Sequence, residues 1–201
     1  MKYFDYDSKA IRFLKNADPI LGKAIDEIGE IKREVTPNLF EGLIRSIIAQ
    51  QISSKAAETV WSRFEKLCSP VTPLSVSQTT PELIQSQGMT MRKARYIHQI
   101  ACLVSEGSLN LESLSKESDD TIAKTLKSLP GIGIWTAEML MIFSLQRPDI
   151  LSWDDLAIRR GMMKLYGLTA LDKPTFLQYK QTYSPYGSVA SLYLWAISVR
   201  E

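Results

Sequence analysis

Apolar side chains recur at helical spacing of three to four residues along almost the whole chain, whereas two-residue alternation is almost absent. The first pattern gives a helix one apolar face, and the second would indicate strands. Proline and glycine punctuate these segments, for example at 36–38, 69–70, 130–131, 147–149 and 184–187. The sequence therefore predicts an all-α protein of about eight to ten helices.

Composition narrows the class of protein further. Hydrophobic residues make up 45% of the 201 residues and charged residues 23%, which suits one good core or two small ones that share a cleft. No apolar run approaches the roughly eighteen residues needed to cross a bilayer, and residues 1–5 have no apolar signal core. We expect a soluble monomer with no membrane partner, cytoplasmic and associated with the nucleoid, or nuclear if the source is eukaryotic.

Charge and metal-ligand chemistry add little by themselves. The formal net charge of +2 does not indicate a nucleic-acid partner, although the basic clusters at 92–95 and 159–160 could contact phosphates. Cys68 and Cys102 are too few for a disulfide framework and have no metal-ligand spacing. His98 is the only histidine in the sequence, so no zinc site is predicted.

The most distinctive stretch begins at Leu129 and reads Leu-Pro-Gly-Ile-Gly-Ile-Trp-Thr-Ala-Glu. Its two glycines, Gly131 and Gly133, are expected to end one helix and start the next with backbone amides pointing outward. Such an amide cluster at a helix N-terminus suits a phosphate. Two carboxylates, Asp154 and Asp155, follow about twenty residues later where another helical pattern begins. Taken alone, the glycine motif is equally typical of an ordinary tight turn between helices.

Five segments of the chain resemble, in the same order, segments of the helix-hairpin-helix (HhH-GPD) superfamily of DNA glycosylases. The resemblance is to its alkyladenine branch in particular, the type II DNA-3-methyladenine glycosylases. The five segments lie within residues 36–200, at 47–53, 88–97, 129–137, 154–161 and 184–195. The resemblance implies a two-lobed HhH-GPD glycosylase fold with an interlobe cleft for the nucleotide. Residues 36–128 would form a helical-barrel lobe, 129–144 the hairpin and the helix that bridges the lobes, and 1–35 with 145–201 the second lobe.

By the same resemblance, Asp155 is the catalytic residue and Asp154 a helix cap or a support. Breaking an N-glycosidic bond builds positive charge on the deoxyribose, and a fixed carboxylate stabilises that charge or orients water onto the sugar. Aspartate is also a common helix cap, so the alternative is that both aspartates only cap the helix.

Trp135, Trp195 and Met139 line the base pocket by resemblance. Trp135 stands where the strand-cleaving relatives carry a lysine that forms a Schiff base, so the resemblance implies a monofunctional hydrolase without AP-lyase activity. Alkylated purines such as 3-methyladenine and 7-methylguanine are cationic, and an indole face attracts a cation. Their departure needs no general acid, which fits the lack of a candidate histidine. For Trp195, a role in the core is the alternative.

Gln51 matches the family's wedge, the side chain that fills the space left by a flipped nucleotide. The alternative is that Gln50 and Gln51 are helix-terminal residues that satisfy backbone groups. The hairpin would anchor a DNA phosphate through the amides of Gly131, Gly133 and Trp135 and the hydroxyl of Thr136.

The resemblance also implies a monovalent cation, Na⁺ or K⁺, on backbone carbonyls of the hairpin, at Lys127, Leu129 and Gly131. No other cofactor is expected, and the chain lacks the four-cysteine loop of the iron–sulfur relatives. Two positions depart from the family. Gly187 stands where many relatives have an arginine, and Ser184 where they have a basic or aromatic residue, which puts DNA affinity or the positioning of Asp155 in doubt.

The expected function is a monofunctional DNA glycosylase that flips alkylated purines out of double-stranded DNA and excises them by hydrolysis, leaving an abasic site for base excision repair. One alternative is a catalytically silent helix-hairpin-helix protein that binds DNA or senses damage. Another is a glycosylase-lyase that uses a lysine outside the motif.

Overall fold

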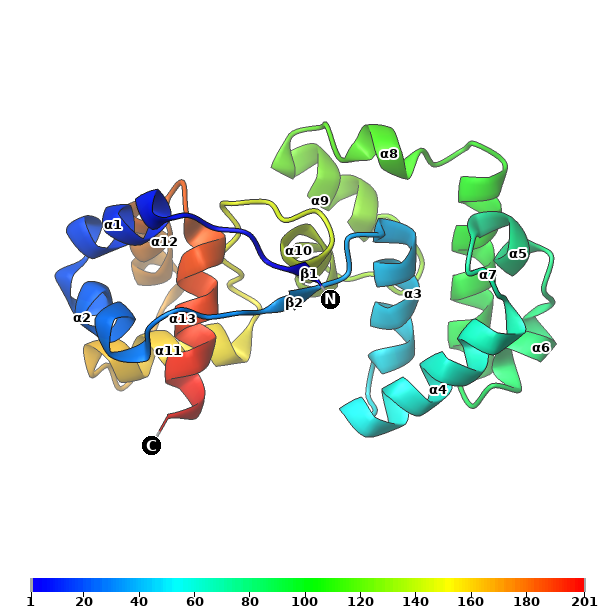
Figure 1. The fold of residues 1–201 in the computed structure, drawn as a ribbon, viewed down its shortest axis with the longest axis horizontal. Coiled ribbons are helices and arrows are strands. Elements are labelled where there is room, and N and C mark those ends of the chain that lie inside the picture. The colour runs from blue at the N-terminus through cyan, green and yellow to red at the C-terminus, as the bar shows by residue number, and fades with distance from the viewer. Residues whose placement is uncertain (1, 201) are drawn as a thin grey trace. The chain divides into compact units, whose positions relative to one another are not determined.

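Short polar side chains mark where most helices begin. In the computed structural model, which describes residues 2–200, thirteen helices and two strands of two residues follow one another along the described chain (Figure 1). Most of the helices start at a Ser, Thr, Asp or Asn whose side-chain oxygen accepts a backbone amide. The all-α prediction is confirmed. The described chain has more helices than the eight to ten predicted, because three of them have only four or five residues.

The chain divides into two units, which are described separately: Thr36–Leu140, and Met1–Val35 with Met141–Glu201. The division falls inside one helix, α10, between Leu140 and Met141. Within residues 2–200, no helix combines the length and the apolar character that crossing a bilayer requires.

In the unit Thr36–Leu140, helix α7 is the element on which the others pack. It contacts α3, α5 and α6, and its inner face is apolar and buried. The helices of this unit are α3 (Leu39–Ala49), α4 (Ser54–Leu67), α5 (Pro73–Ser77), α6 (Pro81–Gln85), α7 (Met91–Ser105), α8 (Leu111–Leu114), α9 (Asp119–Lys127) and the first part of α10 (Ile134–Phe143).

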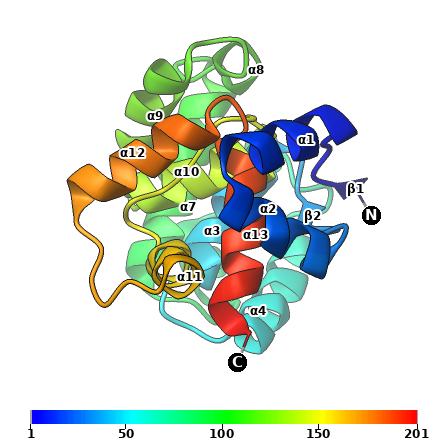
Figure 2. The ribbon, with the colours of Figure 1, turned by 90° about the vertical axis from the view of Figure 1, so that its left-hand side faces the viewer.

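In the other unit, helix α13 runs through the middle, with α1, α2, α11 and α12 around it (Figure 2). It is apolar on nearly all sides, as a helix surrounded by others must be. The elements are β1 (Lys2–Tyr3), α1 (Ser8–Ala17), α2 (Pro19–Ile28), β2 (Glu34–Val35), α11 (Leu156–Tyr166), α12 (Lys173–Tyr183) and α13 (Gly187–Val199). The two strands pair antiparallel, with Lys2 opposite Val35.

Gly161 lets α11 lie very close to α13. A Cβ atom at this position would stand 2.1 Å from the carbonyl oxygen of Leu194, which is backbone and cannot swing away. Only glycine therefore permits this packing, because any larger residue at position 161 would push the two helices apart. Because Asp155 directly precedes α11, the contact also fixes the position of that carboxylate relative to α13.

A buried carboxylate ties α11 to the N-terminal helices. Asp18 caps α2 by accepting the amides of Ile20 and Leu21, and its second oxygen accepts the hydroxyl of Tyr166 at 2.5 Å. Burial raises the pKa of Tyr166, and the contacts with Tyr183 and Asp18 add to this rise. The phenol thus stays a hydrogen-bond donor across the physiological pH range, so α2 and the C-terminal end of α11 remain linked.

Candidate functional site

The hairpin occupies residues 128–133, between the end of α9 and the start of α10. Gly131 has a φ of +80°, and a Cβ there would lie 2.5 Å from Cδ2 of Tyr96. Glycine is required at 131 for both reasons. Gly133 differs, because a Cβ there would meet nothing within 4 Å. Its carbonyl accepts the Ala137 amide at 2.9 Å and so opens α10.

The first turn of α10 lies at the protein surface. Gly133 and Ile134 are exposed, and Trp135 is 46% exposed. The first amides of any helix have no partner within the helix, so an exposed first turn can offer amides to an anion. Thr136, whose hydroxyl was predicted to contact phosphate, is only 8% exposed, and its predicted contact stays a prediction. The other predicted pocket residue of this unit, Met139, is half-buried in the same helix.

Two of the three hairpin carbonyls predicted to bind a monovalent cation already accept hydrogen bonds from the protein. The carbonyl oxygen of Gly131 accepts Nε2 of Gln50 at 2.8 Å, and that of Leu129 accepts the Ile132 amide at 3.2 Å. A carbonyl oxygen has two lone pairs, so both can still bind an ion. The hairpin is thus compatible with Na⁺ or K⁺, although protein donors already satisfy two of the three predicted carbonyls.

Side-chain metal sites find no support in the described part of the chain. Residues 2–200 contain no group of three or more His, Cys, Asp or Glu side chains that could hold a metal ion. His98 instead contacts the Ser77 carbonyl oxygen through Nε2 at 3.1 Å, and Cys68 and Cys102 are free thiols.

Gln51, the predicted wedge, lies exposed in the turn between α3 and α4 in a backbone conformation that is unusual for its residue type. Its φ is +60°, in the left-handed region that non-glycine residues rarely adopt. Such a conformation costs about 1 kcal/mol or more and persists only where neighbouring contacts impose it. Left-handed outliers of this kind concentrate at functional sites, which makes the turn a site candidate on physical grounds.

Lys93 and Gln50 supply those contacts. The Lys93 ammonium on α7 donates to the carbonyl oxygens of Ile48 at 2.9 Å and of Gln50 at 2.5 Å, at the C-terminal end of α3. The Gln50 side chain continues the chain of contacts to the Gly131 carbonyl. Burial, and secondarily the charge of Arg92, lowers the pKa of Lys93. The alternative role considered for Gln50, satisfying a backbone group, is the one the structure shows, and its partner is the hairpin.

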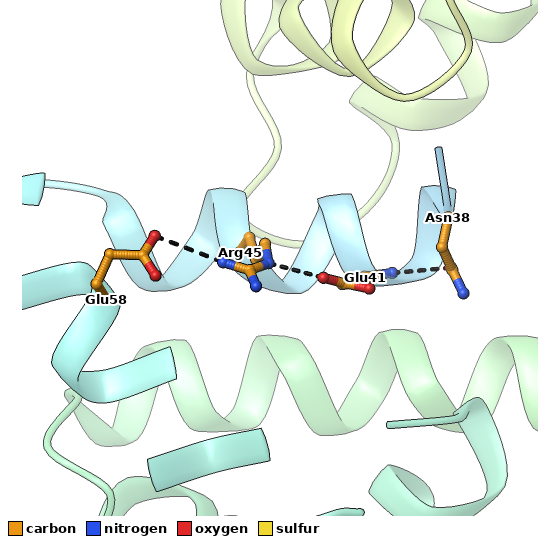
Figure 3. A network of polar contacts seen from close by, with 4 residues as sticks. All are labelled: Asn38, Glu41, Arg45 and Glu58. Carbon is orange, nitrogen blue, oxygen red and sulfur yellow. Dashed lines mark hydrogen bonds and ion pairs between the residues drawn. The ribbon is translucent and has the colours of Figure 1, made fainter. Parts of the chain in front are cut away.

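Arg45 of α3 links α3 to α4 through its side chain (Figure 3). Its guanidinium donates to Glu41 at 2.8 Å and to Glu58 at 3.5 Å, and Cζ lies 3.9 Å from the centre of the Trp61 ring. Trp61 is buried, as expected of a core residue. The two helices that flank Gln51 are therefore braced by a cation with two carboxylate partners and one aromatic partner.

Asp155, in the other unit, is the N-cap of α11. Its Oδ1 accepts the amides of Ala157 and Ile158, both at 2.9 Å, and the residue is only 6% exposed. Asp154 is exposed and does not cap this helix, so of the two roles predicted for it the cap is wrong and the support stays a prediction. The alternative in which both aspartates are caps holds for Asp155 alone. The reason is backbone position: Asp155 has the extended φ and ψ of a cap, directly before the first helical residue, Leu156.

Asp149 anchors the segment that leads to Asp155, and sequence reasoning missed it. Its Oδ1 accepts the Gly187 amide at 3.0 Å and its Oδ2 accepts the Ser184 hydroxyl at 2.5 Å. A Cβ at position 187 would lie 2.8 Å from that Oδ1. Gly187 and Ser184, the two departures from the family pattern, therefore share one structural role. Both hold the Asp149 side chain at the start of α13, Gly187 through its amide and Ser184 through its hydroxyl.

Two buried serines of α13 secure the same segment further along. Ser188 accepts the Ile150 amide at 2.9 Å and donates to the Arg147 carbonyl oxygen at 2.5 Å. Ser191 donates to the Ile150 carbonyl oxygen at 2.9 Å. Side chains of a buried helix thus satisfy backbone groups of Arg147 and Ile150 in the irregular segment that leads to Asp155.

Trp195 lies half-buried on α13 and is stacked on another aromatic ring. Its ring centre is 5.5 Å from that of Phe143, at an interplanar angle of 28°, and the Arg33 guanidinium stands 5.4 Å from the Phe143 centre. Trp195 is therefore not a fully buried core residue. Its predicted contact with the base stays a prediction, as do those of Trp135 and Met139.

Comparison with known proteins places this geometry in a family. Residues 44–182 match the model of the HhH-GPD superfamily of base excision DNA repair proteins. The chain is 32% identical to DNA-3-methyladenine glycosylase 1 of Schizosaccharomyces pombe over 79% of its own length and 72% of that protein. The resemblance inferred from the five sequence segments is confirmed.

Solved structures agree with this assignment. The fold is similar to a DNA-3-methyladenine glycosidase from Bacillus halodurans, with a TM-score of 0.89, 35% identity, and coverage of 99% of this chain and 93% of that one. It is also similar to the S. pombe 3-methyladenine DNA glycosylase in complex with abasic DNA, with a TM-score of 0.80, 29% identity, and coverage of 94% and 95%. The HhH-GPD glycosylase fold is therefore shown for this chain.

The Lys93 contacts predict a local effect of one substitution. Lys93→Met removes the donor to two carbonyls, so the α3–α4 turn should open more often, by roughly 10-fold, as expected for about 1.4 kcal/mol of charge-assisted hydrogen bonding. Hydrogen exchange of the Gln50 and Ile52 amides, which are bonded to the end of α3, measures this opening. Arg92→Met, an exposed neighbour, is the control. Equal exchange in the two variants would contradict the role given to Lys93.

Proposed function

Because this chain belongs to the HhH-GPD superfamily of base excision DNA repair proteins, we propose that it is a monofunctional DNA glycosylase that hydrolyses the N-glycosidic bond of alkylated purines in double-stranded DNA. The observation that carries the proposal is the buried Asp155 carboxylate, which two backbone amides hold in one orientation. Relatives named as 3-methyladenine glycosylases support the class of damaged base.

Asp155 suits the chemistry because its orientation is set before the substrate arrives. As the base leaves, positive charge develops on the deoxyribose, and a carboxylate already held in place stabilises that charge without reorganising. The two amides occupy Oδ1. The carboxylate then stabilises the oxocarbenium-like state or orients the attacking water. An N-alkylated purine carries its own positive charge as a leaving group, so no protein acid is needed.

The hairpin and the α3–α4 turn suit the handling of DNA. The exposed first turn of α10 offers the amides of Gly133 and Trp135 to a backbone phosphate, and the open space beside Gly133 leaves room for it to approach. Gln51 enters the stack where the nucleotide leaves and bonds the orphaned partner base. A Na⁺ or K⁺ ion on the carbonyls of Lys127, Leu129 and Gly131 would add charge toward the same phosphate.

Hydrolysis rather than lyase chemistry is favoured by Trp135, because no lysine lies between residues 128 and 143 to form a Schiff base. We expect the wild type, acting as a monomer, to release free 3-methyladenine and 7-methylguanine from methylated duplex DNA. Strand breaks should appear only after alkali, and borohydride should trap no covalent adduct. An adduct would contradict the monofunctional assignment. Tight DNA binding without base release would instead favour the catalytically silent alternative.

A pair of substitutions separates the two roles of Asp155. Asparagine caps a helix about as well as aspartate but carries no charge, so Asp155→Asn should keep the thermal stability while slowing base release at least 100-fold. Asp155→Ala should slow it as much and also lose about 1 kcal/mol of stability through the missing cap. Single-turnover base release and thermal unfolding measure the two effects. An active Asp155→Asn variant would show that the residue is only a cap.

A further inference from the structure

Arg159, four residues after Asp155, is a half-buried cation without an anion beside it. Within residues 2–200 its guanidinium makes no hydrogen bond or ion pair, and its Nε atom is buried without a hydrogen-bond partner. Its contact with the protein is with an aromatic ring: Cζ lies 4.7 Å from the centre of Trp153. Buried charges in proteins are normally paired, so the guanidinium lacks the partner that its burial calls for.

Arg45 shows how this chain treats a comparable arginine that has a purely structural role. That residue also stacks on a tryptophan, but it is bonded to both Glu41 and Glu58 (Figure 3). Arg159 has the aromatic partner and neither carboxylate. If Arg159 only braced the turn before α11 by stacking on Trp153, nothing would require its Nε atom to be buried without a partner. A bracing role therefore does not explain why Arg159 has no carboxylate beside it.

The position of Arg159 makes its charge costly. It lies in the first turn of α11, where the helix dipole disfavours a positive charge by a few tenths to 1 kcal/mol. The neighbouring Arg160 avoids part of this cost because it is exposed to water. A half-buried cation at this end of a helix is therefore better explained by an anion that arrives with a ligand.

The ring under Arg159 is itself fixed. Trp153 packs edge-on against Phe176 of α12, with ring centres 5.2 Å apart and an interplanar angle of 75°. The guanidinium plane is thereby held next to the turn that ends in Asp155. A planar, prepositioned fork of N–H donors matches the oxygens of a phosphate, and stacking on an aromatic ring leaves its edge free to donate.

We propose that Arg159 binds a phosphate of the DNA backbone beside the nucleotide on which Asp155 acts. This inference rests on the proposed function, since it takes DNA as the ligand. It adds a phosphate contact in the unit that carries Asp155, separate from the hairpin in the unit Thr36–Leu140. Arg159 is a binding residue in this scheme, because its charge neutralises a phosphate and takes no part in breaking the glycosidic bond.

Salt dependence of DNA binding tests the proposal directly. A duplex with a tetrahydrofuran abasic analogue is titrated with the full chain at several salt concentrations. Arg159→Gln should weaken binding about 10- to 100-fold, as for a lost charge-assisted hydrogen bond, and should lower the slope of log K against log salt by about 0.9. Arg159→Lys should keep most of the slope, because it keeps the charge. Arg160→Gln, the matched control in the same turn, should change the slope less.

Two outcomes would overturn the role of Arg159. One is a loss of affinity in Arg159→Gln with an unchanged salt slope, which is the result expected if the residue only braces Trp153. The other is an equal change of slope in Arg160→Gln, which would indicate bulk charge. Base release by the wild type is measured in parallel. Its absence would overturn the proposed function, whereas an active wild type with an unchanged slope in Arg159→Gln overturns only this inference.

Discussion

Two backbone amides hold the Asp155 carboxylate at the start of α11. The packing of the unit formed by residues 1–35 and 141–201 fixes where this helix start lies. The carboxylate can be nearly buried because Ala157 and Ile158 donate to it. Helix α11 packs closely on α13, because Gly161 lets the two backbones approach each other. A helix cap contributes only about 1 kcal/mol of stability. Its larger consequence is that the Asp155 carboxylate is held in one position before a substrate binds.

In the unit Thr36–Leu140, side chains likewise hold a candidate DNA-contacting residue in one conformation. A left-handed residue, Gln51, persists in an exposed turn because Lys93 and Gln50 satisfy the carbonyls around it. The same Gln50 reaches the Gly131 carbonyl, so the turn and the hairpin form one bonded assembly. Two segments proposed to contact DNA are thereby fixed relative to each other before DNA is bound, which reduces the ordering cost of binding.

Local patterns predicted much of the fold and of the candidate site. Helical spacing indicated the all-α class, and the glycine motif located the hairpin, because Gly131 needs a positive φ and has Tyr96 against it. The number of helices was underestimated because a helix of four or five residues is a single turn and has no measurable apolar period. The sequence left open whether Asp154, Asp155 or both cap α11, because helix boundaries depend on backbone angles that the sequence does not specify.

Contacts between distant residues were beyond local patterns. Asp149 bonds Ser184 and Gly187, more than thirty positions away, and sequence reasoning treated those two residues as departures that weaken the site. In the structure they seat the segment that carries Asp155. The Lys93 contacts with Ile48 and Gln50 were missed for the same reason, although the lysine lies in a recognised motif. Nothing in the sequence around Arg159 indicates that its charge is left without a partner.

The central claim is that Asp155 stabilises positive charge on the deoxyribose, and binding to sugar analogues tests it most directly. Affinity is measured for two duplexes that differ only at the lesion, one with a cationic pyrrolidine ring in place of the sugar and one with neutral tetrahydrofuran. The wild type should bind the cationic duplex more tightly, and Asp155→Asn should lose that preference while binding the neutral duplex as before. An equal preference for the cationic duplex in both proteins would contradict the claim.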